Sequence, residues 1–93
     1  MPSYLVESYL AATPAAVDDA RALARRTAEV GHGVRYVRTT FLPGDETVLH
    51  LFEAPSASAL DDAVRRAALP FERIVEAVEG TADAPTEEHA EQA

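Results

Sequence analysis

The sequence predicts an α+β fold in which four antiparallel strands form one sheet and two helices cover one of its faces. Two segments rich in β-branched and aromatic residues flank a Pro-Gly turn, and two further segments have apolar side chains at helical spacing. Shorter apolar segments stand near each end of the chain. The hairpin at residues 34–54, with its turn at 42–46, is the element around which we expect the other segments to be arranged.

The first third of the chain is predicted to contain a strand and then a helix. Residues 3–10 are dominated by aromatic and branched side chains, which favour a strand. Thr13 and Pro14 predict a helix start, because threonine can cap the first turn and proline fits the first helical position. Gly31 and Gly33 predict its end, since glycine tolerates the left-handed conformation that closes many helices.

The hairpin is followed by a second predicted helix and a fourth predicted strand. Ser56 or Ser58 caps the helix, which stops before Pro70 because proline cannot continue it. Residues 72–79 form the last strand. With right-handed crossovers, this order of elements gives the sheet order four-one-three-two with both helices on one face, the ferredoxin-like βαββαβ arrangement.

Side-chain alternation in the hairpin predicts which residues share a face of the sheet. We expect Phe41 to lie opposite Thr47, so that Arg38 lies opposite His50. One face is then apolar and should lie beneath the helices; it carries Val37, Phe41, Leu49 and Leu51. The other face is mixed and should be free of helices; it carries Tyr36, Arg38, Thr40, His50 and Phe52.

The helix-free face is predicted to be covered by a second copy of the chain. Tyr36 and Phe52 make this face too apolar to leave in water. A chain of 93 residues buries only a modest share of its surface by itself, which favours further burial by self-association. We therefore expect a two-fold homodimer with facing sheets, a dimeric α+β barrel.

Composition excludes several classes of function. A net charge of −8 argues against nucleic acid as a partner, because phosphate binding needs a basic surface. The absence of cysteine excludes disulfides, thiolate metal sites and a cysteine nucleophile. No apolar segment approaches the roughly 20 residues of a membrane span and no signal peptide is visible, so we expect a cytoplasmic protein without a membrane partner.

The composition changes near the end of the chain. Residues 1–80 are predicted to form one folded domain, whereas residues 81–93 mix alanine with acidic side chains and show no periodicity. Such a segment cannot bury enough surface to offset the entropy of ordering, so we predict a disordered acidic tail. We interpret His89 as part of this solvated tail.

Four polar side chains are predicted to meet on the helix-free face. They are Glu7, Arg38, His50 and Glu76. Two carboxylates, an imidazole and a guanidinium in one half-buried site can bind an anion, transfer a proton or hold a metal. The same residues could instead form a polar network that fixes the register of the dimer, and the sequence leaves both readings open. Aromatic side chains that could contact a small-molecule ligand are Tyr9, Tyr36 and Phe52.

Four segments together resemble a known family. They are YLVE at 4–7, VRYV at 34–37, FEAPS at 52–56 and LPFERIVE at 69–76. Over about residues 3–79 the chain is similar to the small bacterial nickel-binding, ferredoxin-like domain family, most of whose members are uncharacterised. The resemblance implies a homodimer with nickel bound at the dimer surface.

The resemblance also implies histidines at two positions that are Arg38 and Ala63 here. An arginine repels a divalent cation and an alanine offers no ligand, so nickel or another divalent metal would depend on His50, Glu7 or the tail around His89. Three hypotheses follow. The first is a homodimeric ligand- or metal-binding protein, the second is a small dimeric α+β-barrel enzyme of cyclase or isomerase type with His50 as acid or base, and the third is a structural or regulatory dimer.

Overall fold

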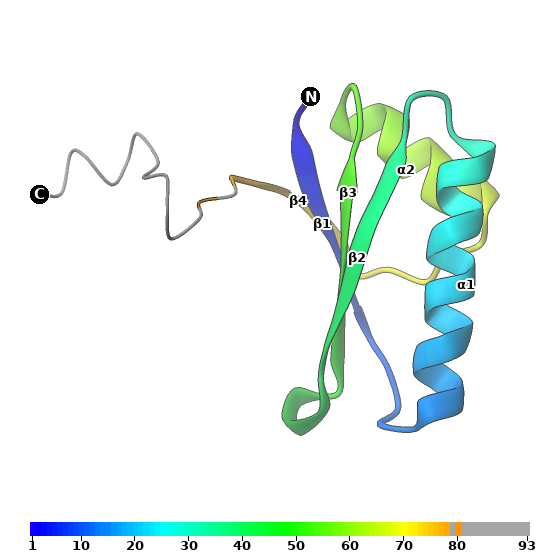
Figure 1. Ribbon diagram of the computed structural model, residues 1–93, viewed down its shortest axis with the longest axis vertical. Coiled ribbons are helices and arrows are strands. Elements are labelled where there is room, and N and C mark those ends of the chain that lie inside the picture. Colours follow the sequence, from blue (N-terminus) through cyan, green and yellow to red (C-terminus); the bar gives the residue numbers. More distant parts are fainter. Residues whose placement is uncertain (79, 81–93) are drawn as a thin grey trace, which may run out of the picture.

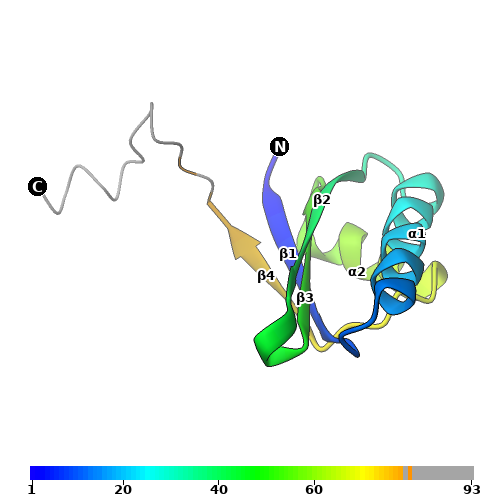
Figure 2. The same cartoon turned by 60° about the horizontal axis from the view of Figure 1, so that its bottom comes forward.

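The elements of the structure, a computed structural model that describes residues 1–78 and 80, follow the predicted order (Figure 1). They are β1 (Ser3–Tyr9), α1 (Pro14–Val30), β2 (Arg35–Leu42), the 3-10 helix η1 (Pro43–Asp45), β3 (Thr47–Glu53), α2 (Ala57–Arg66) and β4 (Arg73–Ala77). All neighbouring strands are antiparallel in the order β2-β3-β1-β4, and both helices lie on one side of the sheet (Figures 1 and 2). The ferredoxin-like prediction is confirmed. The predicted tail, residues 81–93, lies outside the described residues.

The first helix begins where the sequence predicts. The Thr13 hydroxyl oxygen accepts a hydrogen bond from the backbone N–H of Ala16 at 3.2 Å, and Pro14 occupies the first helical position. The predicted left-handed glycine lies further along than the helix end itself. Gly31 has a φ of −92°, whereas Gly33 has a φ of +72° and turns the chain toward β2.

The hydrophobic core lies between the two helices and one face of the sheet. Ser56, rather than Ser58, caps α2 by accepting a hydrogen bond from the N–H of Ala59 at 3.1 Å. The buried cluster comprises Tyr4, Val6, Ala24, Val34, Phe52, Ala54, Leu60, Ala63, Val64 and Leu69. Burial of a large member such as Leu60 contributes about 2 kcal/mol. Within the described residues, neither helix combines the length and the hydrophobicity of a membrane span.

The hairpin turn is one residue shorter than expected. Leu42, rather than Phe41, lies opposite Thr47, so the turn comprises residues 43–46. This turn contains η1 and closes with Glu46 in the left-handed region at φ 48°. Proline and glycine therefore indicated the position of the turn correctly, but not its length.

A β-bulge in β2 compensates for this shift further along the hairpin. It lies between Tyr36 and Arg38. On the turn side of the bulge, Thr39 lies opposite His50, and beyond it Tyr36 lies opposite Phe52. Side chains three positions apart in a regular strand point to opposite faces, so the bulge is what brings Tyr36 and Thr39 to the same face.

The predicted faces of the hairpin are therefore wrong for most of its residues. Tyr36, His50 and Phe52 lie on the helix-covered face, where His50 and Phe52 have no exposed surface. Leu49 and Leu51, expected beneath the helices, lie on the helix-free face. The two shifts cancel at Tyr36 and Phe52, which pair as expected. The error lies in the choice of the row of β3 that faces the helices, because both rows carry large apolar side chains.

Gly31 lies at the close approach of α1 and α2, and its replacement tests the tightness of this contact. A Cβ at this position would lie 2.8 Å from Ala63 Cβ and 2.8 Å from Val34 Cγ2. We expect Gly31→Ala to lower the free energy of unfolding by about 1–3 kcal/mol, because both neighbours belong to the core and cannot yield without repacking. Urea denaturation followed by circular dichroism measures the change.

The matched control is Gly44→Ala in the hairpin turn, where no atom lies within 4 Å of an added Cβ. It should change stability by less than about 0.5 kcal/mol. Wild-type stability in the Gly31 variant would contradict the proposed tight packing.

Candidate functional site

The four predicted site residues do not meet in one site. Glu7 and Arg38 lie on the helix-free face, whereas His50 lies beneath the helices. Glu76 pairs with Tyr4 and therefore belongs to the helix-covered face of β4, where its side chain is exposed. The prediction of a single shared site is wrong, because the shifted register moved His50 to the other face from Arg38.

On the helix-free face, Glu7 is held by an arginine of the neighbouring strand. Glu7 and Arg73 pair directly between β1 and β4, and Arg73 Nε donates to Glu7 Oε1 at 2.5 Å. On its other side Glu7 lies opposite Leu49. This carboxylate is thus already paired with a cation and bordered by an apolar side chain, which leaves little capacity to bind a metal ion.

The aromatic residues predicted to contact a ligand are also divided between the faces. Phe52 is completely buried, and the Tyr36 ring packs against it with a centroid separation of 5.6 Å. Tyr9 lies at the end of β1 and is 67% exposed. Phe52 therefore serves the core, while Tyr9 is accessible to a partner.

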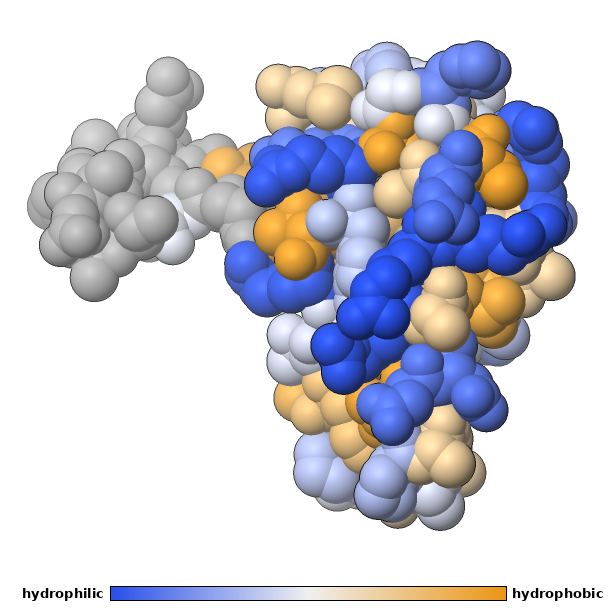
Figure 3. Space-filling model, turned by 45° about the vertical axis from the view of Figure 1, so that its right-hand side comes forward, coloured by the Kyte–Doolittle hydropathy of each residue, from blue (hydrophilic) through white to orange (hydrophobic). Residues whose placement is uncertain are grey.

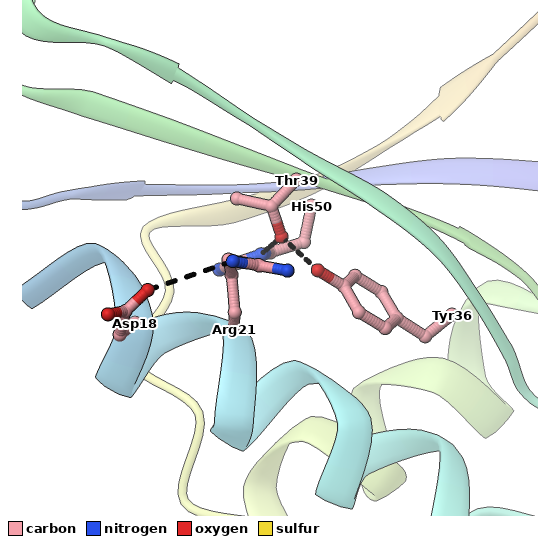
Figure 4. A network of polar contacts seen from close by, with 5 residues as sticks. All are labelled: Asp18, Arg21, Tyr36, Thr39 and His50. Carbon is pink, nitrogen blue, oxygen red and sulfur yellow. Dashed lines mark hydrogen bonds and ion pairs between the residues drawn. The ribbon is translucent and has the colours of Figure 1, made fainter. Parts of the chain in front are cut away.

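A chain of hydrogen bonds connects Tyr36, Thr39 and His50 between the sheet and α1 (Figure 4). Thr39 Oγ1 lies 2.5 Å from the Tyr36 hydroxyl oxygen and 2.8 Å from His50 Nδ1. Sequence reasoning missed Thr39, because the expected register placed it on the face opposite His50. A glycine would have signalled the bulge that brings these residues together, but none stands in β2.

The second ring nitrogen of His50, Nε2, is buried without a hydrogen-bond partner among the described residues. Burial lowers the pKa of His50 from 6.5 to about 4, so the ring is neutral near pH 7. A phenol is a stronger donor than an aliphatic hydroxyl, so we assign the chain as Tyr36 O–H to Thr39 and Thr39 O–H to Nδ1, which leaves the ring proton on Nε2. A buried N–H without an acceptor costs about 1–3 kcal/mol, which makes Nε2 the clearest sign of a binding site in the described residues.

A charged pair on α1 and a shallow groove lie next to this hydrogen-bond chain. Arg21 lies 3.7 Å from Asp18 and extends from α1 toward the sheet in the view of Figure 4. We call the adjoining depression, of about 410 Å³, the α1 groove. It is lined by Ala12, Thr13, Pro14, Val17, Asp18, Phe41 and Pro43.

The described residues contain no group of three or more His, Cys, Asp or Glu side chains placed to hold a metal ion. Of the other histidines, His32 is exposed in the loop after α1, and His89 lies outside the described residues. The predicted metal ligands His50 and Glu7 lie on opposite faces of the sheet. They cannot bind one ion together within a single protomer.

Comparisons with known proteins are consistent with this fold. A family described as "Nickel responsive protein SCO4226-like" matches residues 4–77. The crystal structure of SCO4226 from Streptomyces coelicolor A3(2) is similar with a TM-score of 0.70, over 85% of this chain and 99% of that chain, at 18% sequence identity. At this identity the structural likeness shows the fold alone. No curated protein matches the chain.

The buried imidazole should make stability depend on pH. An unfolded chain protonates His50 near pH 6.5, whereas the folded chain does so only near pH 4. As the pH falls between these values the unfolded state binds a proton that the folded state does not, so stability is complete above pH 6.5 and decreases below it. One pKa unit corresponds to about 1.4 kcal/mol, so the loss should reach about 3 kcal/mol by pH 4.

Urea denaturation at a series of pH values tests this expectation. His50→Gln should flatten the profile between pH 6.5 and 4, because it removes the titrating ring. His32→Gln is the control, since His32 is exposed, and it should keep the wild-type profile. The same pH profile in wild type and His50→Gln would contradict the assignment.

Proposed function

The chain belongs to the SCO4226-like family of nickel-responsive proteins, and from this premise we propose that it is a small homodimeric binding protein without catalytic activity. The helix-free face of the sheet is the observation that carries this proposal. The helices cover the opposite face only (Figure 2). A surface of this kind needs a partner if its apolar side chains are to leave water.

The helix-free face combines apolar side chains with a central ion pair. Its apolar members on β1, β3 and β4 are Leu5, Leu49 and Val75, together with Leu51, which is only 4% exposed in the protomer. Val75 is 36% exposed, and the pair Glu7–Arg73 lies among them. The outer side of α1, by contrast, shows many strongly hydrophilic side chains with small apolar patches between them (Figure 3). A second copy is therefore better accommodated on the sheet than on the helices.

The described residues do not fit a nickel centre within one protomer. The His50 ring is neutral, as a metal ligand must be, but the tautomer assigned above carries its proton on Nε2, which then has no lone pair for a metal ion. His50 is also completely buried, and it belongs to no group of three or more His, Cys, Asp or Glu side chains placed to hold a metal ion among the described residues. The facing sheets of a dimer would not reach it, since His50 lies on the helix-covered face. We therefore assign to this chain the binding of a ligand other than a nickel ion held by these residues.

Binding is also better supported than cyclase or isomerase chemistry. A general base works best when its pKa is close to the working pH, and His50, with a pKa of about 4, is a weak base at neutral pH. The residues once expected to assist it, Arg38 and Glu7, lie on the other face of the sheet. A purely structural or regulatory dimer would not explain why the buried Nε2 lacks a hydrogen-bond partner among the described residues. The unpaired nitrogen therefore favours a binding role over a structural one.

Leu49→Arg tests the dimer. Leu49 lies on the helix-free face between Glu7 and Thr40, so an arginine there would place a charge in the interface. We expect the wild-type chain to elute at twice its mass of 10.0 kDa in size-exclusion chromatography with light scattering, and the variant to elute at the single mass with an unchanged circular dichroism spectrum.

The control for this experiment is Ala22→Arg, on the exposed side of α1, which should remain dimeric. A wild-type chain that stays monomeric at every concentration would rule out the proposed dimer.

Calorimetric titration of the full chain with nickel tests the metal assignment. We expect no saturable heat at micromolar protein, because the described residues offer no set of converging ligands. One-to-one binding that is lost in His50→Gln and kept in His32→Gln would instead place a nickel ion on His50 and overturn this part of the proposal.

A further inference from the structure

We propose that the α1 groove binds a small, mainly apolar organic molecule that carries one neutral hydrogen-bond acceptor, such as a ketone, and that Nε2–H of His50 donates to this acceptor. The inference deepens the binding function proposed above, because it names the class of ligand and the residue that recognises it. It does not depend on the dimer.

The lining of the α1 groove explains why the ligand is mainly apolar. Proline, valine, alanine and phenylalanine side chains form most of the surface. The Thr13 hydroxyl already accepts from the N–H of Ala16, and the Asp18 carboxylate is already paired with Arg21. Among the lining side chains only the Thr13 O–H can donate a hydrogen bond, at the amino end of α1. The groove volume of about 410 Å³ falls in the range of small-molecule sites, roughly 300–1,000 Å³.

The second donor of the proposal, His50 Nε2, is completely buried and is not part of the groove lining, so its link to the groove runs through Phe41. Phe41 lines the groove and lies opposite Val48, on the same face as Thr39 and His50. Across an antiparallel pair, Phe41 and His50 are diagonal neighbours, at a separation that an aromatic side chain spans. The proposal therefore requires the half-buried Phe41 ring to rotate when the ligand binds, so that the α1 groove becomes continuous with the buried Nε2.

The charges near the groove favour a neutral acceptor. The Tyr36–Thr39 chain leaves the proton on Nε2, so the ligand must supply an acceptor and not a donor. A carboxylate ligand would face Asp18 in the lining and a net charge of −8 on the chain, while an ammonium ligand carries only donors and would meet the proton on Nε2. A carbonyl oxygen on an apolar body satisfies Nε2 without either repulsion.

Acetophenone and ethylbenzene are the probes that test the proposal, because they have the same ring and side-chain length and differ by the carbonyl oxygen. We expect the full chain to bind acetophenone saturably in two-dimensional NMR titrations, with shifts at Val17, Phe41 and the Nε2 resonance of His50. Ethylbenzene should bind about fivefold more weakly, which is the effect of one net hydrogen bond. His50→Leu should remove this preference, and His32→Gln should keep it.

Three results would overturn the inference. They are the absence of saturable binding by either probe, equal affinity of wild type for both, and shifts confined to the shallow depression beside α2 and β4 lined by Phe71 and Ile74. The oligomeric state of the same samples separates the two proposals. A dimer that binds neither probe overturns this inference alone, and a monomer that prefers acetophenone overturns the dimer alone.

Discussion

The bulge between Tyr36 and Arg38 is the constraint on which the rest of this structure depends. Without it, Tyr36 and Thr39 would point to opposite faces of β2, and the hydrogen-bond chain to His50 would not exist. The bulge allows Tyr36 to pack against Phe52 in the core while Thr39 contacts His50, which lies two residues before Phe52 on β3. A single extra residue thus places a chain of polar groups on a mainly apolar face of the sheet.

The fold of this chain agrees with its family, but the side chains of its described residues do not provide the metal ligands that the family description would suggest. The order of elements and the sheet topology agree with the family and with the solved structure of similar fold. The described donors do not gather as a metal centre would require. Ala63 illustrates why the helices offer no alternative position, because it is completely buried where α2 meets Gly31 and has no room for a longer side chain. Fold and ligand chemistry have therefore to be judged from different residues.

The sequence predicted local features well, since these depend on neighbouring residues. Thr13, Pro14 and Ser56 mark helix starts through bonds that span one turn, and the structure contains both caps. The faces of the hairpin depend on contacts that span the sheet. Both rows of β3 are apolar, with Val48 and Phe52 on one side and two leucines on the other, so alternation could not tell which row the helices cover.

The candidate site was predicted only in part for the same reason. The sequence identifies His50 as a residue that can do chemistry, but its expected companions depend on face assignments that the structure changes. Val6 lies opposite His50, so Glu7 is on the other face. The shorter turn puts Leu51 rather than His50 opposite Arg38. Thr39 gave no warning because threonine is common in strands for its shape alone. The left-handed Glu46 that shortens the turn was equally hidden, since glutamate is not a residue that usually adopts this conformation.

The way α1 is attached has a mechanical consequence. Its carboxyl end is fastened three times: Gly31 packs on Ala63, Arg66 donates to the carbonyl oxygen of Val30 at 3.1 Å, and Gly33 lies close beneath Pro55. Its amino end borders the α1 groove beside η1. Because α1 is held at its carboxyl end, a small rotation about that end would move the amino end farthest. The amplitude of thermal motion should accordingly grow along α1 from the carboxyl end toward the amino end.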